Sequence, residues 1–203
     1  MDEIGLFPLE LVLLPGERVP LHIFEPRYKE LIEECIDDEV EFGFVLTDEA
    51  GMREIGTRAS VVAVLERFDD GRLNIIVEGG ERFHLIGLTE GRTFMTGEVV
   101  PVSDEDDAPS EEERERCLAA YRRLVDVAEA DVEDLDADAA SLAYEIAARI
   151  ELGTAVKQEL LELRSERDRV LRLSPLLAQA AEAFSRDREV RERASGNGRV
   201  EAL

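Results

Sequence analysis

The chain has 203 residues and carries 24 Lys and Arg against 48 Asp and Glu, which gives a formal net charge of −24. Its hydrophobic fraction of 44% is typical of folded proteins, and its length suits one large domain or two small ones. A surface this acidic repels phosphate backbones and anionic lipid, which argues against nucleic acid and membrane surfaces as main partners.

Residues 1–102 are predicted to form short strands separated by turns, a pattern typical of a small β-barrel or sandwich. Pro15-Gly16 predicts a turn between the first two strands, and Asp70-Gly71 is a strong hairpin signal. Gly79-Gly80 is interpreted as another turn between strands rather than a phosphate-binding loop, because no helix follows it. The expected strands are 6–8, 20–24, 42–47, 56–68, 73–77, 83–88 and 94–102.

One helix is predicted in this half of the chain. Pro26 suits the first turn of a helix, where the missing N–H of proline costs nothing. The apolar residues that follow recur at helical spacing and therefore predict one buried face. They are Tyr28, Leu31, Ile32, Cys35 and Ile36.

Residues 103–109 are acidic, contain a proline and lack large apolar side chains, so they are predicted to be a solvated linker. A helical bundle is expected over 110–185. Its first helix begins at Ser110, which forms a capping box with Glu113. The segment 186–203 is charged and has almost no apolar periodicity, so we expect it to be a disordered tail.

Three further helix starts are predicted within the bundle. One helix carries Leu142 and ends before Gly153, the next begins at Thr154, and the last begins at Ser165. Pro175 is expected to kink this last helix or to begin a new one with Ser174 as its cap.

No local motif of a catalytic site is present. The sequence has no nucleophile elbow, no phosphate-binding loop and no zinc-protease motif. His22 and His84 are interpreted as structural or surface residues. Lys29 and Lys157 fall on predicted helices rich in charged neighbours, so neither is expected to act as a catalytic base. We therefore expect neither an enzyme nor a bound cofactor.

A metal site is not expected either. Cys35 and Cys117 are too few and too far apart for a zinc site or a disulfide framework. Four acidic residues have the spacing of EF-hand ligands, but Ala139 stands where that loop needs glycine, so they are interpreted as residues that favour a helix start. These acidic residues are Asp134, Asp136, Asp138 and Glu145.

The apolar stretch 4–14 has the length of a signal peptide, but Asp2 and Glu3 precede it where basic residues are required, and Glu10 interrupts it. No other segment approaches the roughly 20 apolar residues of a membrane span. We therefore expect a cytoplasmic protein.

The opening of the chain carries its most distinctive motif. Phe7-Pro8-Leu9 and Leu14-Pro15-Gly16 are followed by Pro20-Leu21-His22-Ile23-Phe24-Glu25-Pro26-Arg27-Tyr28. Gly56-Thr57, the Asp70-Gly71 hairpin, Gly80-Glu81-Arg82-Phe83 and the helical run 142–173 accompany it. With these features the chain resembles the Lon protease N-terminal substrate-binding domain in its stand-alone form, over nearly all of its length except the tail.

This resemblance implies an α+β fold, in which a PUA-like β-barrel with one helix is followed by a C-terminal helical bundle. It also implies a module that recognises unfolded or exposed protein segments, with a protease or ATPase as a further class of partner. The ATPase and Ser-Lys protease domains that follow this region in Lon are not expected within a sequence that ends at Leu203. The chain is therefore predicted to be non-catalytic.

Three charged residues of the matching motifs are candidate peptide contacts. Glu25, Arg27 and Arg82 would line a groove where an extended peptide adds to the edge of a strand. The alternative for the first two is structural, because either can cap or pair around the start of the helix while Phe24 packs from the strand before it.

Two other classes of function stay open. PUA-like barrels in other families bind RNA, and such binding here would need a local basic face despite the net charge. An enzyme whose site is assembled from distant residues would need a carboxylate or histidine with a perturbed pKa in a closed pocket.

Overall fold

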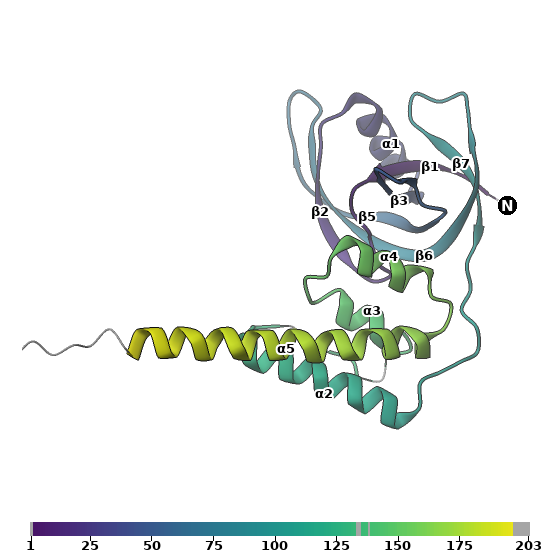
Figure 1. Ribbon diagram of the computed structural model, residues 1–203. Coiled ribbons are helices and arrows are strands. Elements are labelled where there is room, and N and C mark those ends of the chain that lie inside the picture. Colours follow the sequence, from purple (N-terminus) through teal and green to yellow (C-terminus); the bar gives the residue numbers. More distant parts are fainter. Residues whose placement is uncertain (1, 133–134, 138, 197–203) are drawn as a thin grey trace, which may run out of the picture. The chain divides into compact units, whose positions relative to one another are not determined.

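Figure 1 shows the computed structural model of the chain, which describes residues 2–132, 135–137 and 139–196. The chain divides into two units. The first contains the chain up to Glu105 together with the later segment Ile150–Arg164. The second contains Asp106–Arg149 and the chain from Ser165 onward.

Strands and helices of the first unit follow the predicted order closely. The strands are β1 (Asp2–Leu9), β2 (Arg18–Ile23), β3 (Phe42–Asp48), β4 (Gly51–Met52), β5 (Ile55–Arg67), β6 (Leu73–Thr89) and β7 (Thr96–Pro101). The helices are α1 (Pro26–Asp37) and α4 (Thr154–Glu162). Of these strands, β4 is too short to give a sequence signal.

The sheet of this unit closes on itself. β1 pairs with β7, β7 with β6, β6 with β5 and β5 with β3, all antiparallel. β3 then returns to β1 in parallel register, with Leu6 opposite Gly43, and completes the ring. β2 pairs with β6, and β4 with β3. The α+β fold with an N-terminal ring of strands and one helix is therefore confirmed.

The helix α1 packs its predicted apolar face into the barrel core. Tyr28, Leu31, Ile32 and Cys35 are buried there with the phenylalanines of β1 and β3. The rings of Phe7 and Tyr28 lie 4.2 Å apart between centroids. Because much apolar surface is removed from water at this contact, the contact holds α1 against the barrel core.

The turn predicted at Gly79-Gly80 is wrong, since both glycines lie inside the single long strand β6. The physical reason is a close backbone approach. Gly79 exchanges hydrogen bonds with the turn before β2, accepting from the Gly16 N–H at 2.8 Å and donating to the Glu17 carbonyl at 3.0 Å. A Cβ at Gly79 would stand 2.2 Å from the Leu14 carbonyl oxygen. Glycine is therefore needed here because two backbone segments approach closely, not because the chain turns.

Helix α4 belongs to the first unit, although a helical bundle is predicted over all of 110–185. Gln158 donates from its amide to the Ile55 carbonyl on β5 at 3.2 Å. Arg82 on β6 donates to the carbonyls of Leu161 and Leu163, at 2.8 and 2.6 Å. Contacts between segments this distant in sequence leave no local signal.

Part of the predicted linker is also bound to this unit. The Glu105 N–H donates to the Arg164 carbonyl at 2.7 Å, and Arg164 donates to the Ser103 carbonyl at 3.3 Å. Asp104 forms an ion pair with Arg82. Residues 103–105 are therefore held against the barrel, and the boundary between the units falls after Glu105.

The second unit is made of helices that pack on one another, as predicted. They are α2 (Glu111–Ala128), α3 (Leu142–Ala147) and α5 (Glu166–Gly196), and α5 contacts both of the others. Apolar residues at helical spacing form the buried stripes. On α2 these are Cys117, Leu118, Tyr121 and Leu124, and on α5 they are Val170, Leu173, Leu177 and Ala181.

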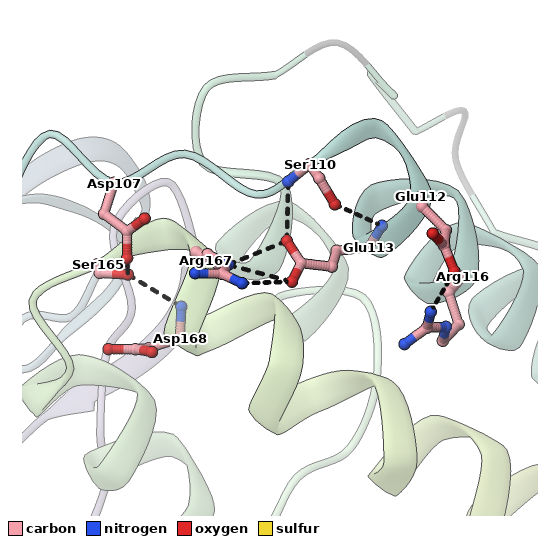
Figure 2. A network of polar contacts seen from close by, with 8 residues as sticks. All are labelled: Asp107, Ser110, Glu112, Glu113, Arg116, Ser165, Arg167 and Asp168. Carbon is pink, nitrogen blue, oxygen red and sulfur yellow. Dashed lines mark hydrogen bonds and ion pairs between the residues drawn. The ribbon is translucent and has the colours of Figure 1, made fainter.

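Polar contacts join the starts of α2 and α5, as Figure 2 shows. The capping box is confirmed, because the Glu113 N–H donates to the Ser110 hydroxyl and the Ser110 N–H donates to the Glu113 carboxylate. The same carboxylate accepts bidentate hydrogen bonds from the Arg167 guanidinium, at 2.9 to 3.1 Å. Ser165 caps α5 by accepting from the Asp168 N–H at 3.0 Å.

The helix α5 differs from its prediction at two places. It continues through Pro175, so of the two expected alternatives, a kink at Pro175 or a new helix with Ser174 as its cap, the second is wrong. It also extends to Gly196, whereas we expected disorder from residue 186 onward; residues 197–203 lie outside the described chain. Buried side chains on both sides of Pro175 explain its tolerance, since their packing offsets the lost hydrogen bond.

Candidate functional site

The motif residues Glu25 and Arg27 lie together at the start of α1. Glu25 is the N-cap residue by backbone geometry, but its side chain caps no N–H. It accepts instead from the Arg27 guanidinium at 2.9 Å, and the side chains are 40% and 48% exposed. The guanidinium carbon of Arg27 also lies 4.5 Å from the centre of the Tyr28 ring. The pair is therefore held by the helix and open to solvent.

Three aromatic rings form a surface beside this pair. The ring of His22 stacks on Phe24 at 6.0 Å and meets Phe68 edge-on at 6.0 Å. Phe24 is 60% exposed, so the expectation that it packs from the strand before the helix is wrong. We call His22, Phe24 and Phe68 the aromatic patch. Exposed aromatic surface of this kind is characteristic of protein-binding sites.

A row of polar side chains across the sheet holds His22 in place. Its Nδ1 lies 2.7 Å from the Asn74 side-chain oxygen, and the Asn74 amide donates to Glu66 at 3.0 Å. The three residues are cross-strand neighbours on β2, β6 and β5. This row fixes the imidazole against the Phe24 ring, so the patch is preorganised.

Arg82, the third candidate, is not close to the other two. Figure 1 shows α1 and α4 at opposite ends of the first unit, and Arg82 bonds to the end of α4. Its side chain is 5% exposed and is occupied by two carbonyls and Asp104. This side chain anchors the end of α4 to the barrel.

Lys157 lies on a helix with charged neighbours, as predicted. It is buried on α4 and forms an ion pair with Glu17. The Glu17 carboxylate also accepts from the Leu14 N–H at 3.0 Å. Lys29, by contrast, is at the surface and donates to the Asp70 carbonyl at 2.8 Å.

The thiols and acidic residues show no metal-binding arrangement within the described part of the chain, where no group of three His, Cys, Asp or Glu could hold an ion. Asp134 and Asp138 of the EF-hand-like spacing lie outside the described residues. Burial raises the pKa of the Cys35 and Cys117 thiols to about 12, so both are poor nucleophiles. Over those same residues, each helix is too short or too polar to cross a bilayer.

Comparison with known proteins places the chain in a family. The ATP-dependent protease La (LON) substrate-binding domain matches residues 3–179. The Lon protease of Parabacteroides distasonis is 30% identical over 132 residues, which are 61% of this chain and 16% of that protein. The Lon protease of Escherichia coli is 22% identical over 212 residues, 94% of this chain and 26% of that protein. The chain thus spans only a minor part of these relatives.

Solved structures agree with this assignment. A crystal structure of a Lon N-terminal domain protein from Xanthomonas campestris aligns with a TM-score of 0.69 at 25% identity, covering 85% of this chain and 97% of that one. The N-terminal domain of the Mycobacterium avium complex Lon protease aligns with a TM-score of 0.64 at 16% identity, covering 89% and 98%, and supports the fold alone. The chain belongs to the family of the ATP-dependent protease La (LON) substrate-binding domain.

Proposed function

We propose that this domain is a non-catalytic module of the cytoplasm that binds unfolded or exposed protein segments through the aromatic patch and the Glu25–Arg27 pair. The observation that carries the proposal is the exposure of Phe24, at 60%, on a preorganised surface in a family named for substrate binding. Contact with apolar side chains of an unfolded segment would remove this ring from water, which stabilises by about 25 cal/mol per Å².

Glu25 and Arg27 supply the polar part of the proposed contact. They neutralise each other in the free protein, so they present a donor and an acceptor to a peptide backbone without adding net charge. Arg82 contributes indirectly, because it fixes α4 on the barrel. An ATP-dependent protease is the proposed recipient of the bound segments, as the description of the family suggests.

The test is a titration of a labelled, permanently unfolded polypeptide with the purified protein, followed by fluorescence anisotropy at low and high salt. We expect saturable binding that persists in salt, because apolar contact dominates it. Phe24→Ala should weaken binding about tenfold. The matched control is Leu88→Ala, which removes an equally exposed apolar side chain from β6. A folded protein should not bind.

Two outcomes would contradict the proposal. The first is the absence of binding to unfolded polypeptide at about 100 μM, well above the range of a weak specific complex. The second is binding of single-stranded RNA that weakens steeply with salt, which would indicate a local basic face and support the nucleic-acid alternative instead.

A further inference from the structure

The strand β5 has a free edge over much of its length. β6 pairs with one side of β5 from Ile55 to Arg67, whereas β3 pairs with the other side only at 57–59. Among the residues that the structure describes, no strand pairs with 60–67 on that second side. The backbone N–H and C=O groups of such an edge are a template for one more strand.

A groove runs between this edge and the end of α1. Its volume is about 450 Å³, and most of the residues that line it are apolar, while polar atoms make up about half of the exposed lining surface. Val62 and Val64 on β5 are 45% and 38% exposed, and Val40 on the facing side is 49% exposed. A groove between a strand edge and a helix can accept an extended peptide as an added strand, whose alternate side chains enter the groove.

Two irregularities in the free part of β5 limit what can pair with it. The register with β6 shifts between Val61 and Ala63 and again between Val64 and Glu66. Bulges of this kind twist an edge and interrupt long ladders, which protects against pairing between copies of the chain. The segment 60–65 is about 20 Å long at the usual rise per residue, so it suits a short peptide.

The acidic residues beside the groove favour one class of short peptide over others. Asp37, Asp38 and Glu39 are exposed at the end of the groove next to α1, and Glu39 lines it. Glu66 is exposed further along β5. A second copy of the chain, at −24, would be repelled. Arg67 is exposed next to Glu66, so the acidic end of the groove is the one beside α1, and a segment flanked by Lys or Arg would be attracted there.

We propose that the groove between α1 and the free edge of β5 binds a short extended protein segment, with alternating apolar residues and basic flanks, by adding it to the sheet. This inference rests on the proposed function and specifies the substrate class. β5 leads directly from the groove to Phe68 of the aromatic patch, so the patch and the groove adjoin the same strand.

The test uses a fluorescent peptide in which Val and Thr alternate between Lys pairs at both ends. Two derivatives are N-methylated at alternate amides, one on each edge of the extended peptide. Because only one edge of an added strand faces β5, methylation of that edge should weaken binding about tenfold or more, and methylation of the other edge should leave it unchanged. A peptide with Asp flanks should bind about tenfold more weakly than the Lys form.

Protein variants provide a second measurement. Val62→Asn should reduce affinity for the Lys-flanked peptide about tenfold, because it removes an apolar contact without adding charge, and Leu88→Asn, at a similarly exposed position on β6, should not. Equal effects of the two methylations, or full binding by Val62→Asn, would overturn the inference. If unfolded polypeptide still bound in that case, the proposed function would stand; if it did not, both would fail. Self-association abolished by Val62→Asn would show that the groove holds a second copy, and would also overturn the inference.

Discussion

Lys157 and Glu17 form a buried ion pair although 140 residues separate them in the sequence. Lys157 lies on α4, and Glu17 lies in the turn before β2. Their side chains are 11% and 8% exposed, so water screens the pair weakly. The pair connects α4 to the barrel from within.

Removal of one partner of this pair should destabilise the first unit strongly. Lys157→Met leaves Glu17 charged and buried without its cation, so we expect a loss of about 3 kcal/mol in the free energy of unfolding, measured by urea denaturation. Lys29→Met is the matched control, because the other lysine is at the surface, and it should cost about 0.5 kcal/mol or less. The double variant with Glu17→Gln should recover part of the loss. Equal effects of the two lysine substitutions would contradict this prediction.

Stability of the second unit should fall at acidic pH through Glu113. Hydrogen bonds from Arg167 and from the Ser110 N–H lower the pKa of this carboxyl from 4.5 to about 2. A depressed folded-state pKa contributes stability that is complete above the unfolded-state value and is lost as the pH falls through the folded-state value. The contribution of Glu113 should therefore disappear between pH 4.5 and about 2.

Glu113→Gln tests this dependence. The variant should be less stable than the parent near neutral pH, and its urea midpoint should fall less steeply over the same acidic range. Glu112→Gln is the control, because the Glu112 side chain is 85% exposed and pairs with Arg116 one helical turn away. Parallel midpoint curves for the parent and Glu113→Gln would show that the contact with Arg167 does not stabilise the fold.

Gly79 should not tolerate even a methyl group. Gly79→Ala would place a Cβ 2.2 Å from a backbone carbonyl, so the turn before β2 would have to shift. We expect a loss of about 3 kcal/mol in thermal or urea denaturation. Gly87→Ala, where the added Cβ meets nothing within 4 Å, should change stability little. A tolerated Gly79→Ala would show that this backbone contact is not needed.

The two cysteines should report separately on the two units. Burial raises the pKa of both thiols to about 12, and Cys35 lies in the first unit and Cys117 in the second. In Cys117→Ser and Cys35→Ser variants, the remaining thiol should react with a thiol reagent only as its own unit unfolds in urea. Rapid reaction in native buffer would contradict the burial of that thiol.

Local signals explain which parts of the fold could be predicted. Pro26, the Asp70-Gly71 pair and the Ser110–Glu113 capping box each act within a few residues, and the helices and hairpin that they mark are present. The placement of α4, the continuity of β6 through Gly79 and the passage of α5 through Pro175 depend instead on packing between distant segments. Such contacts have no pattern in the sequence.

The candidate site was predictable only in part. The motif pointed to Glu25 and Arg27, which the structure brings together. It gave the wrong role to Phe24, because apolar residues occupy both faces of the segment 20–24 and alternation alone does not tell which face is inward. The free edge of β5 follows from strand pairing, which the sequence does not reveal.

The return of the chain to its first unit has a consequence for biosynthesis. A ribosome must translate the whole of Asp106–Arg149 before the last helix of the barrel unit exists. Until then Glu17 lacks Lys157, and Arg82 lacks the carbonyls of Leu161 and Leu163. Domains usually fold in the order in which they emerge. Here the amino-terminal unit cannot be completed before most of the carboxyl-terminal half has been made.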